Sequence, residues 1–228
     1  MKQLCVFCEG RTEQRFAAQV LQPHLFPSGD GIIHTLAVGE RDFHHVYGLG
    51  RRTKYERVRR FIINTIKQRG GANVYFTSLF DLYGLPADFP GKTENVRDAA
   101  NPTPYVKAIE DAFGRDINYR RFLPYLQLHE FETILFSEPD GFAISFDDCD
   151  DAIQELKKMA VSVPSVEHID DGESTAPSKR ILQVIPAYEG LKSTAGADIA
   201  EYIGVPRIRE KCHHFDEWLS MLENIVWE

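Results

Sequence analysis

The chain has no long apolar run and few cysteines, and both absences narrow what it can be. None of its 228 residues belongs to an apolar stretch near the roughly 20 residues that a membrane-spanning helix needs. Met1, Lys2 and Gln3 lead directly into the first apolar segment, so we expect no signal peptide and a cytoplasmic location. Four cysteines are too few to build a disulfide framework in a chain of this size.

Cys5 and Cys8 have CxxC spacing, which raises the alternatives of redox chemistry and zinc binding. A redox CxxC normally begins a helix, where the thiolate is stabilised. Residues 3–8 instead read as a strand, on which positions three apart point to opposite faces. We therefore predict two buried core residues, with a zinc site completed by the Cys212–His214 segment as the alternative.

The charge of the chain is negative overall but unevenly distributed. A net charge of −8 argues against a general nucleic-acid coat protein. Between residues 51 and 60, however, Glu56 is the one acid among six basic residues, namely Arg51, Arg52, Lys54, Arg57, Arg59 and Arg60. Such a block usually forms a solvated helix face. Beside an acidic metal cluster, it would also suit a phosphodiester substrate.

Segments typical of strands and helices alternate through the first part of the chain. Apolar and β-branched segments predict four strands at residues 3–8, 31–38, 73–80 and 122–128. Helical periodicity predicts helices between them at residues 12–26, 53–69 and 102–113. This alternation predicts an α/β fold, in which a four-stranded, mostly parallel sheet carries helices on both faces.

The second part of the chain has a different pattern. From residue 147 onward we find helical segments only, at residues 148–159, 178–184, 196–203, 207–211 and 215–226. We therefore expect an α/β domain over residues 1–146 and a helical extension over residues 147–228 that packs on it.

Carboxylates follow three of the four predicted strands. Glu9 follows the first strand, with Glu13 at the start of the next helix; Asp81 follows the third strand; Glu130 and Glu132 follow the fourth. Because parallel strands share a carboxyl edge, these acids are expected to meet there. A cluster of carboxylates repels itself, and Mg²⁺ or Mn²⁺ would neutralise it. The alternative for Glu13 is the ordinary preference for an acid at a helix N-terminus.

The residues around Glu9 and Asp81 resemble the Toprim domains of topoisomerases, primases and the overcoming-lysogenization-defect (OLD) nucleases. Over nearly its whole length the chain is similar to a large bacterial family known as domain of unknown function 4276. Five separated motifs carry this similarity, at residues 8–13, 80–86, 128–132, 177–180 and 203–219.

The Toprim resemblance implies roles for the first three acids. Glu9 would match the first-strand glutamate, a metal ligand or general acid/base, and Glu13 would serve a second metal. Asp81 would match the first aspartate of the DxD motif. Two such ions can clamp a phosphodiester and activate the attacking water.

The chain departs from the Toprim pattern at Tyr83, which replaces the second acid of the DxD motif. Glu130 or Glu132 would then have to complete the metal site. Lys179, or Arg180, would match a basic group that stabilises charge on the phosphoryl group in the transition state.

These expectations describe a metal-dependent nuclease that acts on DNA or RNA, with Glu9, Asp81 and Lys179 as its catalytic residues. The basic residues expected to bind the nucleic acid are Arg51, Arg52, Lys54 and Arg57. The resemblance further implies an ATPase partner of the AAA or ABC type and a role in phage defence. The alternative is an inactive Toprim-like module that docks on or regulates an ATPase, which Tyr83 favours.

Overall fold

The computed structural model describes residues 1–38, 55–96, 98, 101–169, 172 and 174–228. Its centre is a sheet whose described strands are all parallel, in the order β2-β1-β3-β4, with β5 also pairing with β3. The strands are β1 (Lys2–Cys8), β2 (Gly31–Ala37), β3 (Val74–Asp81), β4 (Phe122–Leu123) and β5 (Leu126–Gln127). The predicted α/β class with a parallel sheet is confirmed.

The prediction of a single fourth strand was wrong, because the segment is interrupted between β4 and β5. Pro124 has no N–H to give to the backbone ladder. The Tyr125 N–H donates instead to Ser78 Oγ at 2.9 Å, and the Ser78 hydroxyl donates to the Tyr125 carbonyl at 2.8 Å. A side chain of β3 therefore replaces the backbone pairing at this point, and the described sheet has five strands.

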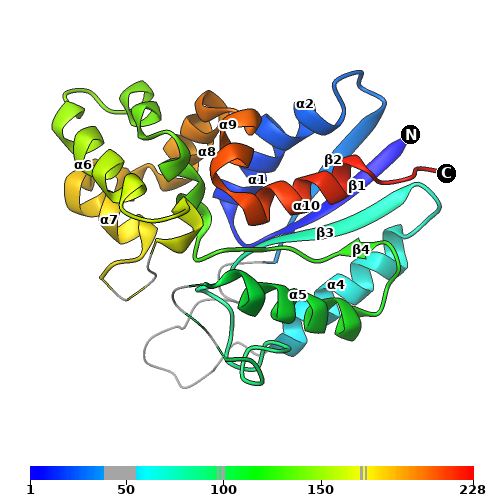
Figure 1. Ribbon diagram of the computed structural model, residues 1–228. Coiled ribbons are helices and arrows are strands. Elements are labelled where there is room, and N and C mark those ends of the chain that lie inside the picture. Colours follow the sequence, from blue (N-terminus) through cyan, green and yellow to red (C-terminus); the bar gives the residue numbers. More distant parts are fainter. Residues whose placement is uncertain (39–54, 97, 99–100, 170–171, 173) are drawn as a thin grey trace.

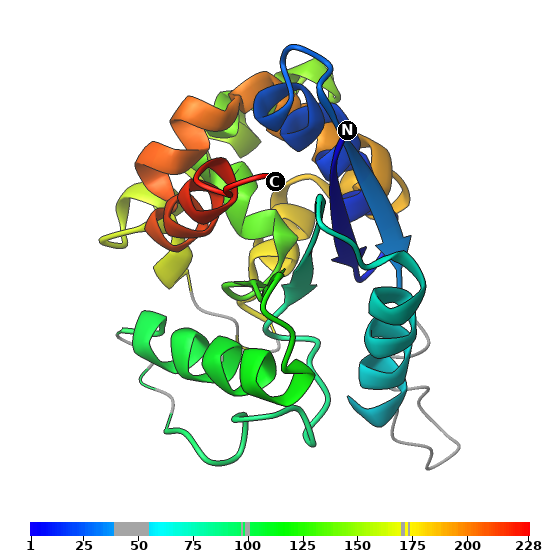
Figure 2. The ribbon, with the colours of Figure 1, turned by 90° about the vertical axis from the view of Figure 1, so that its right-hand side faces the viewer.

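Helices cover both faces of the sheet, as predicted (Figures 1 and 2). One face carries α4 (Tyr55–Arg69) and α5 (Thr103–Ile117). The other carries α10 (His213–Glu223) and one helical segment made of α1 (Arg11–Phe16), the π-helical η1 (Ala17–Leu21) and α2 (Gln22–Leu25). Successive side chains along a strand point to opposite faces of the sheet. Each buried strand therefore contributes apolar side chains to the packing against both helix layers.

Cys5 and Cys8 illustrate this alternation. Cys5 packs in the apolar cluster beneath α4 and α5, whereas Cys8 packs in the cluster that contains residues of α1 and α10. All four cysteines are free and buried. The prediction that Cys5 and Cys8 are core residues on opposite faces is confirmed.

After β5, the part of the chain that the structure describes contains helices and loops but no further strand. Its longer helices are α6 (Asp150–Val161), α7 (Pro177–Val184), α8 (Lys192–Ile203), α9 (Val205–Lys211) and α10. Short 3₁₀ segments connect them: η2 (Phe131–Ser137), η3 (Pro139–Ile144), η4 (Val166–His168) and η5 (Pro186–Gly190). Within the described ranges, none of these helices is long and apolar enough to cross a bilayer.

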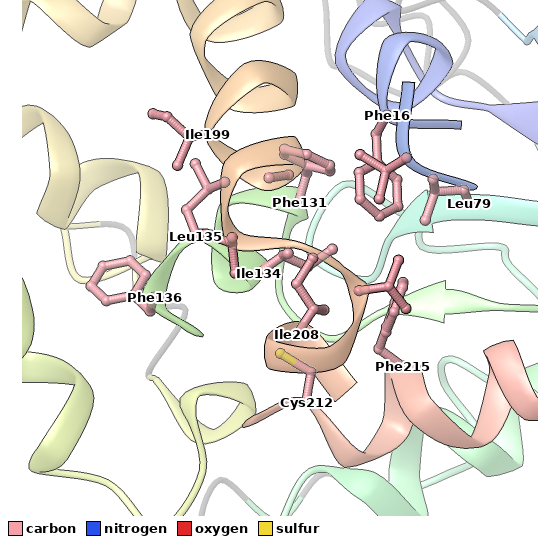
Figure 3. Packing of buried hydrophobic residues seen from close by; sticks show 14 of the residues in the cluster. Phe16, Leu79, Phe131, Ile134, Leu135, Phe136, Ile199, Ile208, Cys212 and Phe215 are labelled. Atoms are coloured by element: carbon pink, nitrogen blue, oxygen red, sulfur yellow. The ribbon is translucent and has the colours of Figure 1, made fainter. Parts of the chain in front are cut away.

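The larger apolar cluster joins the sheet to these later helices (Figure 3). Phe131 of η2 lies between Phe16 of α1, at a ring-centroid distance of 5.5 Å, and side chains of α8 such as Ile199. Phe215 of α10 approaches Phe16 from another side at 6.0 Å. One continuous core therefore spans residues from both halves of the sequence.

A buried polar network anchors β5 between the two helical layers. Glu110 of α5 accepts hydrogen bonds from the Leu126 N–H at 2.7 Å and from His214 Nε2 of α10 at 2.9 Å. His214 stacks on Tyr125, which stacks on Trp218 at 4.2 Å. Burial lowers the pKa of His214, but the Glu110 carboxylate more than offsets this and raises it above 6.5. The network holds β5 in place, and the chain continues from there to Glu130.

Candidate metal centre at the carboxyl edge of the sheet

Glu9 and Asp81 meet at the ends of two adjacent strands. β1 and β3 run side by side with Cys8 opposite Leu79, so the residues that follow them emerge together. The Glu9 carboxylate accepts a hydrogen bond from the Asp81 N–H at 3.2 Å. Asp81 is only partly buried as a residue, but its Oδ1 atom is shielded from solvent and has no hydrogen-bond partner in the described structure.

Gly84 allows the loop after β3 to close over Glu9. A Cβ atom added at Gly84 would lie 3.0 Å from Glu9 Oε1. Such a contact is tighter than nearly all real Cβ contacts, so with a larger residue the carboxylate would have to shift by a few tenths of an ångström. Glu9 is consequently buried, with 5% of its surface exposed.

Glu13 joins the cluster from the first turn of α1. Its carboxylate accepts a hydrogen bond from the Gly10 N–H at 2.7 Å, which is the half of a capping box that the acid at the third helical position supplies. Burial first, and then the negative charge of Glu9, raise its pKa from 4.5 to about 8. The residue therefore caps the helix and also experiences the charge of the neighbouring acids.

Glu130 and Glu132 reach the cluster from the start of η2. Glu130 accepts a hydrogen bond from the Ser178 N–H at the beginning of α7. Burial, followed by the charge of Glu132, raises its pKa to about 7. Glu132 accepts a hydrogen bond from the Tyr188 hydroxyl at 3.3 Å and pairs with Lys192 at 3.6 Å.

The pKa of Asp81 is influenced by the charges of all four other acids, so the five carboxylates lie close enough to interact electrostatically. Burial raises the pKa of Asp81 well above the ordinary value, and the next causes are the charges of the four other carboxylates, in the order Glu9, Glu13, Glu132 and Glu130. The structure therefore brings together all five acids that the sequence places after strand ends. Closely spaced carboxylates disfavour simultaneous ionisation, so such a cluster attracts protons or cations.

The chemistry of this donor set suits Mg²⁺ or Mn²⁺, which prefer carboxylate oxygens. The buried Asp81 Oδ1 atom, which has no hydrogen-bond partner among the described residues, is an available ligand atom. The present side-chain orientations are less favourable: among the described residues, no group of three or more His, Cys, Asp or Glu side chains is arranged to hold a metal ion. Glu9, Glu13 and Glu130 each accept a backbone N–H, which occupies one of the roughly four acceptor positions of each carboxylate.

Among the described residues, a cation that lies at the carboxylates is Lys192, which sequence reasoning missed. Lys179, the basic residue predicted for this role, lies exposed on α7. Arg180 donates to the Thr175 carbonyl at 2.6 Å. A single lysine at the start of a late helix carries no signal in the sequence, because only the packing of α8 against α1 brings Lys192 to Glu132.

The predicted nucleic-acid-binding block can be followed only in part. Arg51, Arg52 and Lys54 lie outside the described residues, and Arg57 is exposed on α4. The remaining two arginines are engaged in ion pairs, Arg59 with Asp116 at 2.7 Å and Arg60 with Glu56 at 3.2 Å.

His129 links the loop after β3 to η4 through hydrogen bonds on both its backbone and its side chain. It has a φ of 62°, a backbone conformation that non-glycine residues rarely adopt. Its carbonyl accepts the Tyr83 N–H at 2.9 Å, and its Nε2 atom donates to the Glu167 carbonyl at 2.9 Å. The Glu167 carboxylate in turn accepts the first N–H groups of α10 at 3.0 and 3.1 Å. Glu167 had no recognisable role in the sequence because it caps a helix that begins 46 positions later.

The parallel sheet, with helices on both faces and buried carboxylates at its carboxyl edge, defines an α/β protein. In open sheets of this class, ligands generally bind at the carboxyl ends of the strands. The chain belongs to the family described as Domain of unknown function (DUF4276), whose model matches residues 8–223. The predicted family is thereby confirmed, and the match includes all five clustered acids. No curated protein and no solved structure matches the chain.

Proposed function

We propose that this protein hydrolyses phosphodiester bonds of DNA or RNA with the help of Mg²⁺ or Mn²⁺. The observation that carries the proposal is the cluster itself: five carboxylates from three segments of the chain influence one another's ionisation, and Asp81 Oδ1 has no partner within the described structure. If the acids had only a structural role, each buried carboxylate oxygen would be expected to have a hydrogen-bond partner. Asp81 Oδ1 has none among the described residues.

In this proposal the acids bind the metal ions and Lys192 attracts the phosphate. Glu9 and Asp81, which lie closest to the two strand ends, would hold the ions together with Glu13 and one of the two η2 acids. Bound metal would supply an activated water and stabilise charge on the phosphoryl group. Lys192 adds a positive charge beside Glu132 and would help to attract the phosphate.

The Toprim resemblance supports the same reaction, since acids after β1 and β3 match its metal-binding positions. We also propose, from the resemblance to OLD nucleases, that the protein acts with an ATPase of the AAA or ABC type in phage defence. Arg51, Arg52, Lys54 and Arg57 remain our candidates for contact with the nucleic-acid backbone.

A cleavage assay with purified protein tests the proposal. Plasmid DNA and labelled RNA are incubated with Mg²⁺, Mn²⁺ or EDTA and with wild type, Glu9→Gln or Asp81→Asn. Each substitution should lower the rate by about a hundredfold, since even outer-shell partners of metal ligands are worth 10–100-fold. Asp30→Asn is the matched control, because Asp30 is an exposed carboxylate paired with Lys2 at the opposite edge of the sheet. Equal activity in all four proteins would show that the cleavage comes from a contaminant.

The second candidate is an inactive module that docks on an ATPase. The hydrogen bonds from backbone N–H groups to Glu9, Glu13 and Glu130 favour it, because these bonds give the acids a structural role without metal. Titration with Mn²⁺ by calorimetry separates the two candidates. Binding that Asp81→Asn abolishes supports the nuclease, whereas no heat of binding at millimolar Mn²⁺ favours the inactive module.

A further inference from the structure

The loop after β3 carries an exposed aromatic side chain, that of Tyr83, two residues along the chain from Asp81. Half of the Tyr83 surface, 50%, is exposed, whereas its neighbours Leu82 and Leu85 are buried at 4% each. Within the described part of the chain, the Tyr83 hydroxyl makes no hydrogen bond and its ring contacts no other aromatic ring. Its side chain therefore contributes little to the core, although the loop that carries it is well packed.

The backbone beneath this ring is held on both sides. The Tyr83 N–H donates to the His129 carbonyl at 2.9 Å. The next residue, Gly84, packs so closely on the Glu9 carboxylate that an added Cβ would lie 3.0 Å from it. The ring thus projects from a fixed point that is one residue from the Glu9 contact and two residues from Asp81. Because the backbone is already fixed, only the side-chain torsions of Tyr83 would lose freedom when the ring binds a ligand.

A flat, exposed ring that has no partner among the described residues is suited to stack on another flat ring. Every nucleic-acid base offers such a face, and stacking on aromatic side chains is a general way of holding single strands. In a duplex, both faces of a base are covered by its neighbours, so only an unpaired base is accessible to Tyr83. Base stacking would give Tyr83 a function at the position where the Toprim pattern has the second acid of the DxD motif.

We propose that Tyr83 stacks on an unpaired base next to the phosphate held at the carboxylate cluster, and that the substrate is single-stranded nucleic acid. This inference rests on the proposed nuclease function and deepens it by naming the substrate class. The carboxylates and their ions would hold the phosphate, while Tyr83 selects the strand state.

The test compares a labelled oligonucleotide with the same strand annealed to its complement. Wild type, Tyr83→Phe and Tyr83→Leu are assayed in Mn²⁺ for kcat and KM. Tyr202→Leu is the control, because Tyr202 is a similarly exposed tyrosine, at 57%, at the far end of α8 from Lys192. A second readout is the fluorescence of 2-aminopurine in the single strand, measured in Ca²⁺, which changes when the base stacks.

Wild type should cleave the single strand faster than the duplex. Tyr83→Leu should raise KM for the single strand about tenfold, in line with the loss of one stacked base, with kcat little changed. It should also abolish the 2-aminopurine signal, while Tyr83→Phe and Tyr202→Leu behave as wild type.

Two results would overturn the inference, and they differ in what else they overturn. If wild type cleaves and Asp81→Asn does not, but Tyr83→Leu matches wild type on both substrates, stacking is wrong and the nuclease proposal stands. If wild type neither binds nor cleaves either substrate in Mn²⁺, both proposals fail together.

Discussion

Replacing Glu13 by Gln should make the fold more stable at alkaline pH. The substitution keeps an oxygen that accepts the Gly10 N–H but removes the ionisable group. In the folded protein the pKa of Glu13 is raised from 4.5 to about 8 by burial and by the charge of Glu9. The unfolded chain therefore ionises first as the pH rises, and the folded state retains the proton. Stability is full below about pH 4.5 and is lost progressively as the pH rises toward 8.

The size of the effect follows from the two pKa values. At 1.36 kcal/mol for each pKa unit, the gap between 4.5 and about 8 corresponds to at most about 5 kcal/mol at pH 8 and above. The other acids of the cluster share this proton binding, so we expect Glu13→Gln to recover about half of it. For a chain of this length, about 2–3 kcal/mol raises Tm by roughly 5–10 °C.

Thermal unfolding from pH 5 to pH 9 in EDTA, at constant ionic strength, measures this difference. The wild-type Tm should fall faster with pH than that of Glu13→Gln, and the two curves should converge near pH 5. Glu56→Gln provides the control, because Glu56 is an exposed glutamate that pairs with Arg60 on α4. Parallel curves for wild type and Glu13→Gln would refute the reasoning, as would a wild-type Tm that rises between pH 5 and pH 8.

Two further predictions concern α8. Gly196→Ala should destabilise the fold by about 1–3 kcal/mol, since its Cβ would lie 3.0 Å from the nearest side chain; urea unfolding should show no comparable loss for Gly190→Ala, which has open space around it. Lys192→Met removes the positive charge beside Glu132, so calorimetry should show tighter Mn²⁺ binding, by a few fold, while the cleavage rate falls. Lys179→Met should change neither quantity, because Lys179 is exposed on α7; a larger effect there would reverse the roles of the two lysines.

The pattern of apolar and polar residues in the sequence was sufficient to predict the parallel sheet and the edge of the sheet at which its acids lie. Strand and helix periodicities alternate, and parallel strands all present their carboxyl ends at one edge. Glu9, Asp81 and Glu130 could therefore be expected at a common edge before any contact was known. The same periodicity argument placed Cys5 and Cys8 on opposite faces, which the two apolar clusters confirm.

Periodicity could not predict where a side chain takes the place of a backbone group in the hydrogen bonding of the sheet. The fourth strand reads as continuous in the sequence, yet the Ser78 hydroxyl takes over the pairing next to Pro124 and divides it. A serine in a buried strand has no property that announces this exchange, because it depends on the distance to the neighbouring strand.

The sequence by itself determined the α/β class, the shared edge of the strands and the identity of the acids that follow them, because these depend on periodicity and strand direction. Only the tertiary structure decided which groups complete the site. Lys192, Tyr188 and the Ser178 N–H reach the carboxylates from helices far along the chain. Their approach depends on the packing of α7 and α8 against η2 and of α8 against α1. Long-range packing of this kind produces no periodic pattern in the sequence.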